Sequence, residues 1–330
     1  MSLQKGLVVK TQSGFFTVKT EDGRLLVCRI PGRLKVEHQR HIDLDPDFPP
    51  ADIVAVGDRV QVAELSSGKG EIEIVEERVR ALIRRAPVPG GRDSNPSEQL
   101  YKQIIVANPD QAVFVFAVMD PAPSPRMLDR FLVMAEDSAL PSVVCVNKID
   151  LAVSMGEPDY PRRVFGLYED IGYPVVYTSA VTGAGVATLR AVLTGKISVL
   201  AGPSGAGKSS LLNAVQPGLG LAVQAVSRAT GKGRHTTRVR ELIPLCGGGY
   251  VADTPGLRGL ALWDIEPDEL DAYFREMAPL VEQCSFSDCS HTHEPGCAIL
   301  AAVEEGRIAP ERYESYLRLR DEAAELPWWA

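Results

Sequence analysis

Four short runs of residues carry chemistry suited to nucleotide binding, and they stand in an unusual order. Asn-Lys-Ile-Asp at residues 147–150 comes first, and Thr-Ser-Ala at 178–180 follows. The glycine-rich run GPSGAGKS occupies 202–209, and Asp-Thr-Pro-Gly occupies 253–256. In an ordinary GTPase the glycine-rich run leads and the Asn-Lys-x-Asp run comes later. The exchanged order predicts a circularly permuted GTPase.

The glycine-rich run has the spacing of a phosphate-binding loop, and it follows a five-residue apolar stretch. Its glycines let backbone N–H groups turn toward phosphates, and the helix that follows adds its positive N-terminus. Lys208 is expected to reach the β- and γ-phosphates. The residues predicted to line this loop are Gly202, Pro203, Ser204, Gly205, Ala206, Gly207, Lys208, Ser209 and Ser210.

The Asn-Lys-x-Asp run indicates guanine recognition. Asp150 can accept two hydrogen bonds from the guanine edge that adenine does not offer, and each lost partner costs roughly 1–3 kcal/mol. On its own the run is a weak signal, but the phosphate loop and the Ser-Ala pair strengthen it. The predicted base-reading residues are Asn147, Lys148, Ile149, Asp150, Ser179 and Ala180.

Two further segments favour a magnesium-dependent nucleotide site. Asp253 would lie near Mg²⁺, and Gly256 would offer a backbone N–H to the γ-phosphate. Ser209 is a predicted Mg²⁺ ligand. The basic, glycine-containing segment around Thr236 and Thr237 is the predicted switch loop. The hydroxyl of Thr237 or of Thr236 is predicted to complete the set of Mg²⁺ ligands.

The residue after the Asp-x-x-Gly run bears on hydrolysis. Many small GTPases place a glutamine there to orient water, but this chain has Leu257. Slow intrinsic hydrolysis is therefore expected, with His235 as the candidate in the chain that orients water. A phosphate or RNA contact is the alternative role for His235. The predicted catalytic residues are Lys208, Asp253 and His235.

Three cysteines and a histidine near the C-terminus have metal-ligand spacing. Cys284, Cys289, His291 and Cys297 offer three thiolates and an imidazole, which suits one closed, structural Zn²⁺ site. His293 is an alternative to His291. Disulfides are not expected from this pattern.

Bulk properties limit the class of protein. The 330 residues predict two or three domains, and 45% hydrophobic residues support a sizeable core. The net charge of −8 argues against a simple basic nucleic-acid binder, although residues 1–40, 78–92 and 226–240 are rich in Lys and Arg. The absence of a signal-peptide pattern and of a bilayer-spanning apolar run predicts a cytoplasmic protein with no membrane partner.

The pattern of short elements predicts three domains. Residues 1–82 hold five short strand candidates with a hairpin turn at 21–23, which favour a small barrel of the OB-fold type, with an SH3-like barrel nearly as suitable. Residues 83–262 alternate apolar strands with helices, as in a parallel α/β sheet, and each nucleotide motif follows a strand. The elements expected in this region are a linker rich in Pro and Gly at 86–92, a helix at 125–137 and strands at 112–118, 142–146, 175–177 and 197–201. Residues 263–330 are helical and acidic around the metal ligands.

Taken together, these features resemble the ribosome small-subunit-dependent GTPase A (RsgA) family. The motif order, the N-terminal barrel, the terminal cysteine cluster and the loop 233–237 carry the resemblance, which covers nearly the whole chain. It implies an OB-fold, a permuted P-loop GTPase domain and a zinc domain. It also implies a factor in late maturation of the bacterial small ribosomal subunit that hydrolyses GTP when bound to the subunit and its rRNA. A monomer is expected.

Two other classes of function fit the sequence less well. An ATP-using kinase or ATPase conflicts with the Asn-Lys-x-Asp run. A nucleic-acid-binding module with a vestigial nucleotide site conflicts with intact Lys208, Ser209 and Asp253. The sequence therefore favours an active GTPase.

Overall fold

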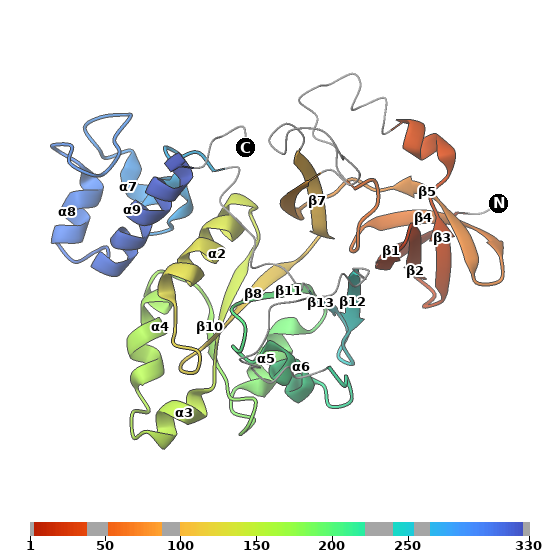
Figure 1. Ribbon diagram of the computed structural model, residues 1–330, viewed down its shortest axis with the longest axis horizontal. Helices are drawn as coiled ribbons and strands as arrows, with labels where there is room; N and C mark the ends of the chain where they lie inside the picture. The colour runs from red at the N-terminus through yellow and green to blue at the C-terminus, as the bar shows by residue number, and fades with distance from the viewer. Residues whose placement is uncertain (1–2, 38–51, 88–99, 222–239, 254–264, 326–330) are drawn as a thin grey trace. The chain divides into compact units, whose positions relative to one another are not determined.

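The structure is a computed structural model (Figure 1) that describes residues 3–37, 52–87, 100–221, 240–253 and 265–325. The chain forms two compact units. The first, called the barrel unit, comprises Met1–Asp110, Leu193–Leu200 and Ser227–Gly256. The second, called the helical unit, comprises Gln111–Val192, Ala201–Val226 and Leu257–Ala330.

A closed five-stranded barrel begins the chain. Its strands are β1 (Leu3–Gln12), β2 (Phe15–Thr20), β3 (Leu25–Arg29), β4 (Arg59–Ser66) and β5 (Lys69–Val75). They pair in the order β1-β2-β3-β5-β4, and β4 pairs with β1 to close the barrel. Because β5 inserts between β3 and β4, the connections are not those of a simple meander, which fits the Greek-key order of an OB-fold.

The barrel is closed around alternating apolar side chains. Val18, Leu26 and Ile72 are buried in its core, while their strand neighbours face outward. The predicted turn between β2 and β3 is present, with Gly23 at φ 87°. The inward residues of the strands form most of this core, and Val54, just before β4, adds to it.

Three further strands belong to the barrel unit and extend its sheet. They are β11 (Ile197–Ala201), β12 (Arg240–Pro244) and β13 (Tyr250–Asp253). β11 and β13 are parallel, β13 and β12 are antiparallel, and β12 pairs antiparallel with β1. The barrel is therefore joined through β1 to strands that flank the predicted switch loop.

A separate hairpin in this unit was not predicted. β6 (Ala81–Pro87) pairs antiparallel with β7 (Leu100–Ala107). The sequence predicted a linker over 86–92. That prediction is wrong for residues 86 and 87, which close β6, and residues 88–92 lie outside the described part of the chain.

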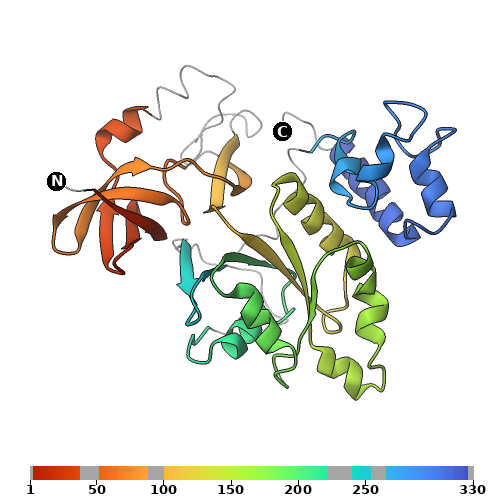
Figure 2. The same ribbon diagram turned by 180° about the vertical axis from the view of Figure 1, so that it is seen from behind.

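The helical unit has a parallel sheet with helices packed against it. Its strands are β8 (Gln111–Ala117), β9 (Ser142–Asn147) and β10 (Val175–Tyr177). Every residue of β8 is buried, as expected of a strand covered on both faces. α2 packs on β8, and α4 packs on β9 and β10 (Figures 1 and 2). The helices of this part are α2 (Pro125–Asp137), α3 (Ile149–Ser154), α4 (Tyr160–Asp170), α5 (Val186–Leu193) and α6 (Lys208–Val215).

The C-terminal helices share a core with α2. The elements are the 3-10 helix η2 (Leu270–Tyr273), α7 (Ala278–Val281), α8 (Ala298–Glu304) and α9 (Pro310–Glu325). Val133 of α2 lies in the same buried cluster as Phe274, Ile299 and Tyr316. The C-terminal helices are therefore packed onto the nucleotide domain through apolar contacts.

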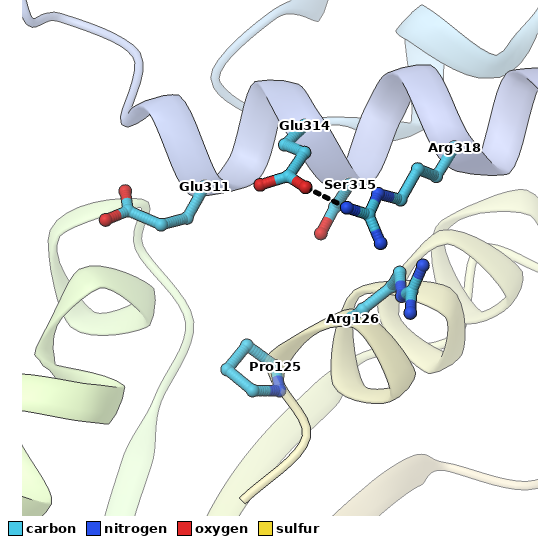
Figure 3. A pocket seen from close by; sticks show the side chains of 6 residues that line it. All are labelled: Pro125, Arg126, Glu311, Glu314, Ser315 and Arg318. Carbon is cyan, nitrogen blue, oxygen red and sulfur yellow. Dashed lines mark hydrogen bonds and ion pairs between the residues drawn. The ribbon is translucent and has the colours of Figure 1, made fainter.

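A shallow pocket lies between the start of α2 and α9 (Figure 3). Arg126 faces it from α2, and Glu314 and Arg318 form an ion pair with each other on α9. The lining carries two arginines and two glutamates, so neither an anionic nor a cationic ligand is favoured there.

The strands and helices that carry the nucleotide motifs lie where the sequence predicts them. The expected strands at 175–177 and 197–201 and the helix at 125–137 coincide with β10, β11 and α2. Among the described residues, no helix has the length and apolar character needed to cross a bilayer. The three-domain boundaries remain a prediction.

Candidate nucleotide site and metal centre

The glycine-rich loop between β11 and α6 needs its glycines for steric reasons. Gly202 has φ 144°, and a Cβ placed there would lie 2.0 Å from the carbonyl oxygen of Val115. Gly207 has φ 92° and is the N-cap of α6. A Cβ at Gly207 would meet the Asn147 amide at 2.3 Å. The loop can therefore pass this close to β8 and β9 only because these positions lack side chains.

Lys208 extends along the loop. Its Nζ donates to the carbonyl oxygens of Gly202 and Pro203, at 2.8 Å each. Ser209 and Ser210 follow in the first turn of α6, and Ser204 is exposed at the loop tip. A helix start with N–H groups and a lysine amine facing one loop suits a bound anion.

Asn147 joins three loops at the ends of the strands. Its Nδ2 donates to the Ala206 carbonyl at 2.9 Å, which connects it to the phosphate loop. Its Oδ1 accepts from the Ala180 N–H and the Thr178 hydroxyl, both at 3.3 Å. The side chain is buried at the end of β9. One amide therefore sets the spacing between the phosphate loop and the predicted base-reading loops.

The Asp150 carboxylate is oriented by Ser179. The Ser179 hydroxyl donates to Asp150 Oδ1 at 2.5 Å and accepts from the Thr182 N–H at 3.1 Å. Lys148 adopts a left-handed backbone at φ 64°, and its amine contacts the Asp120 carbonyl. Ile149, between them, donates its N–H to the Thr178 carbonyl at 3.2 Å. This geometry holds a carboxylate acceptor and a lysine stem beside the phosphate loop.

Several predicted site residues fall outside the described part of the structure. They are His235, Thr236, Thr237, Gly256 and Leu257. The backbone of Asp253 closes β13, but the position of its side chain is not described. The roles of these residues in Mg²⁺ binding and hydrolysis remain predictions.

The four predicted metal ligands come together in the C-terminal helices. The ligand atoms of Cys284, Cys289, His291 and Cys297 all lie within 4.8 Å of one another. His291 Nδ1 is 3.3 Å from Cys297 Sγ and 3.6 Å from Cys284 Sγ. A tetrahedral ion with bonds of about 2.0–2.3 Å places its sulfur and nitrogen ligands roughly 3.5 Å apart. The cluster therefore fits a single metal ion. His293 is exposed, and its ring contacts the Thr292 hydroxyl instead.

The groups around the ligands also suit a metal ion. His291 is fully buried, and its Nε2 is 2.9 Å from Asp271 Oδ2, which leaves Nδ1 facing the thiols. A carboxylate on the far nitrogen is the usual partner of a metal-bound histidine. Burial and the neighbouring Cys297 raise the pKa of the Cys289 thiol to about 12. A cation would oppose this shift, because metal-bound thiols are deprotonated.

Other contacts fix the loop that carries His291. His291 has φ 58°, which is uncommon for a side chain with a Cβ. The Glu294 carboxylate accepts from the N–H groups of Ser290, Thr292 and His293 at 2.9–3.1 Å. Tyr313 of α9 donates to the His291 carbonyl at 2.6 Å. Sequence reasoning missed Asp271, Glu294 and Tyr313, because their contacts with the histidine loop follow no ligand spacing.

A family profile described as RsgA GTPase matches residues 76–263. The chain belongs to the RsgA GTPase family. A relative from Gemmatimonas aurantiaca, named small ribosomal subunit biogenesis GTPase RsgA, is 45% identical and covers 96% of both chains. A protein of the same name from Bacteroides fragilis is 39% identical over 97% of both chains.

Solved structures of similar proteins share the fold. YjeQ from Thermotoga maritima matches with a TM-score of 0.76 and 37% identity, over 98% of this chain and 99% of that one. YloQ, described as a circularly permuted GTPase, matches with a TM-score of 0.72 and 31% identity, over 98% of this chain and 96% of that one. The predicted permuted GTPase fold of this RsgA family member is confirmed.

Proposed function

We propose that this chain hydrolyses GTP in late maturation of the small ribosomal subunit and that binding to the subunit stimulates turnover. The observation that carries the proposal is the buried Asn147 amide, which holds the phosphate loop against the loop of Ala180, with Asp150 oriented beside it. The names of the relatives, which describe small ribosomal subunit biogenesis GTPases, support the subunit as partner. We propose a cytoplasmic monomer.

The proposed roles follow from the chemistry of each group. Asp150 accepts hydrogen bonds from guanine, and Lys208 with the loop N–H groups neutralises phosphate charge. Ser209 and Thr237, or Thr236, would hold Mg²⁺ with Asp253 nearby. When bound, Mg²⁺ would stabilise charge that develops on the phosphates. Because Leu257 cannot hydrogen-bond water, His235 is proposed to orient the attacking water.

The metal of the C-terminal cluster is proposed to be Zn²⁺. Three thiols and one imidazole leave no open position, and such sites are structural rather than catalytic. The ligands tie together the chain after α7, the start of α8 and the loop held by α9. Its proposed role is therefore to hold the C-terminal helices together.

The barrel is proposed to contact rRNA. Among its cations, Arg24 pairs with Asp22 and Glu64, Arg33 pairs with Glu73, and Arg29 lies over the Phe15 ring. Reversing those charges would also break contacts inside the barrel. Better probes are the exposed cations Lys5, Arg59 and Lys69, whose side chains form none of the ion pairs described within this domain.

The test is co-sedimentation with small subunits in the presence of GTP, GDP or a non-hydrolysable analogue, with hydrolysis measured in parallel. Tightest binding with the triphosphate and a steep loss of affinity with salt are expected, since phosphate contacts release counterions. Replacing Lys5, Arg59 and Lys69 with Gln should weaken sedimentation without changing GTP affinity. Hydrolysis that is indifferent to small subunits would overturn the proposed partner.

A further inference from the structure

The barrel pairs directly with β12, the strand that follows the predicted switch loop in the chain. β1 pairs with β12 through Lys10 with Glu241 and Thr11 with Arg240. Arg240, the first residue of β12, stands three positions after Thr237 in the chain. β12 pairs in turn with β13, which ends at Asp253. One sheet therefore connects the barrel to the end of the first predicted switch segment and to the start of the second.

The Arg240 side chain strengthens this connection. Its Nη1 donates to the Ile104 carbonyl on β7 at 2.7 Å and lies 3.3 Å from Asp52 Oδ2. The same carboxylate oxygen accepts from the Ile104 N–H at 3.1 Å. Arg240, Asp52 and Ile104 thus form a closed set of polar contacts, called here the Arg240 junction. Arg240 and Asp52 are each about a quarter exposed, 24%.

Asp52 is itself held by the barrel. Arg78 donates to the carbonyls of Asp52 and Ile53, at 3.0 and 3.2 Å. Arg78 also binds both carboxylate oxygens of buried Asp58, at 2.7 Å each. The Asp58 carboxylate further accepts from the Ala55 N–H at 2.7 Å. The Arg240 junction is therefore connected to the buried framework of the barrel.

We propose that Arg240 is a positioning residue for stimulated hydrolysis. It holds the end of the switch segment in a fixed relation to the barrel, so that a barrel bound to rRNA sets the position of the groups just before β12. This inference rests on the proposed function, since it explains how binding at the barrel reaches the hydrolytic groups. A planar guanidinium bonded to a carbonyl and a carboxylate fixes direction better than a single ammonium contact.

The test compares Arg240→Gln and Asp52→Asn with the parent protein. Subunit-stimulated kcat should fall about tenfold, the scale expected when catalytic groups are displaced by a fraction of an ångström to 1 Å. Basal hydrolysis, KM for GTP and co-sedimentation with subunits should stay unchanged. Arg240→Lys should recover part of the stimulation, since an amine can still reach the Ile104 carbonyl.

A matched control lies one position along the same strand pair. Lys10 and Glu241 form an exposed ion pair at 3.1 Å across β1 and β12. Lys10→Gln should keep full stimulation, because exposed pairs fix little geometry. Equal stimulation of the parent and Asp52→Asn would overturn the inference. So would an equal fall of basal and stimulated rates, which would assign Arg240 a purely structural role.

The two proposals fail in different ways. If small subunits do not stimulate the parent protein at all, the proposed partner is wrong. If they stimulate the parent and both junction variants alike, the partner stands and only the role of Arg240 is wrong.

Discussion

Two arginines, one in each unit of the chain, hold distant segments together, and their surroundings differ. Arg312 of α9 is 1% exposed and bonds Asp129 of α2 at 2.5 Å and Glu276 at 2.6 Å. Arg240 of β12 is 24% exposed and has one carboxylate at 3.3 Å. The first arginine joins the C-terminal helices to α2. The second joins the barrel to the strand that follows the switch loop.

The surroundings of Arg312 make its contact permanent. Burial opposes its charge, but Asp129 and Glu276 outweigh burial and raise the pKa of the guanidinium. The Phe274 ring lies 4.4 Å from the guanidinium carbon. Opening this contact would expose an unpaired charge to an apolar core, which is costly. Arg240 is partly exposed, so water can hydrate the groups left by a lost contact, and loss of this junction should lower the free energy of unfolding less than loss of the Arg312 contact.

The contacts of Arg312 and Arg240 therefore have different roles. The C-terminal helices share a core and a buried ion pair with α2, which lies in the same unit as the predicted base-reading residues. The barrel is joined to the strand that follows the switch segment by a strand pair and by the Arg240 junction, whose two side chains are about a quarter exposed. A fully buried contact stabilises the fold, whereas a partly exposed one can position the switch segment while contributing little to the free energy of unfolding.

The largest effect is expected from removing the metal proposed to hold the C-terminal helices together. Structural zinc sites contribute on the order of 10 kcal/mol to folding. Chelation, or Cys297→Ser, should unfold α7 to α9 and loosen α2 while the barrel stays folded, as measured by amide hydrogen exchange. Cys246→Ser, at an exposed cysteine outside the cluster, is the control. Uniform exchange across all regions would contradict this expectation.

Removal of the buried charge should have the next largest effect. Arg312→Met should lower the free energy of unfolding by about 3–5 kcal/mol, since it leaves Asp129 and Glu276 uncompensated. Urea denaturation measures the loss. Arg318→Met, on the exposed face of the same helix, should cost at most about 1 kcal/mol. Similar losses in the two variants would show that Arg312 is not a fixed buried contact.

The preference for guanine should depend on Asp150 in the helical unit and not on the Arg240 junction. Asp150→Asn should weaken GTP binding by roughly 1–3 kcal/mol per lost hydrogen bond and should admit xanthosine triphosphate. Competition binding of the two nucleotides measures this. Asp159→Asn, before α4, is the control. Arg240→Gln should leave the preference for guanine intact. A changed preference in that variant would show that the Arg240 junction also affects base recognition.

The smallest effect is expected at the exposed pair beside Arg240. Lys10→Gln should change the free energy of unfolding by less than about 1 kcal/mol. Thermal unfolding of the two proteins side by side is sufficient. A larger loss would show that the β1–β12 pairing depends on charge rather than on its backbone hydrogen bonds.

Residue order alone predicted the features that depend on local spacing. The phosphate loop, the Asn-Lys-x-Asp run and the four metal ligands each lie within a short segment, so residue order alone indicates their chemistry. The apolar runs predicted β8 to β11 because buried parallel strands need continuous apolar residues. The permuted order of the motifs followed directly from the chain.

The contacts that join distant segments follow from packing in three dimensions and could not be predicted from the sequence. Asp52 and Arg240 are 188 positions apart, and Asp129 and Arg312 are 183 apart. The β3–β5 pairing that fixes the barrel order, and the choice of His291 over His293, likewise depend on packing. Charged side chains follow no periodicity that names their partners. Which carboxylate meets which arginine is therefore settled only when the core brings the strands and helices together.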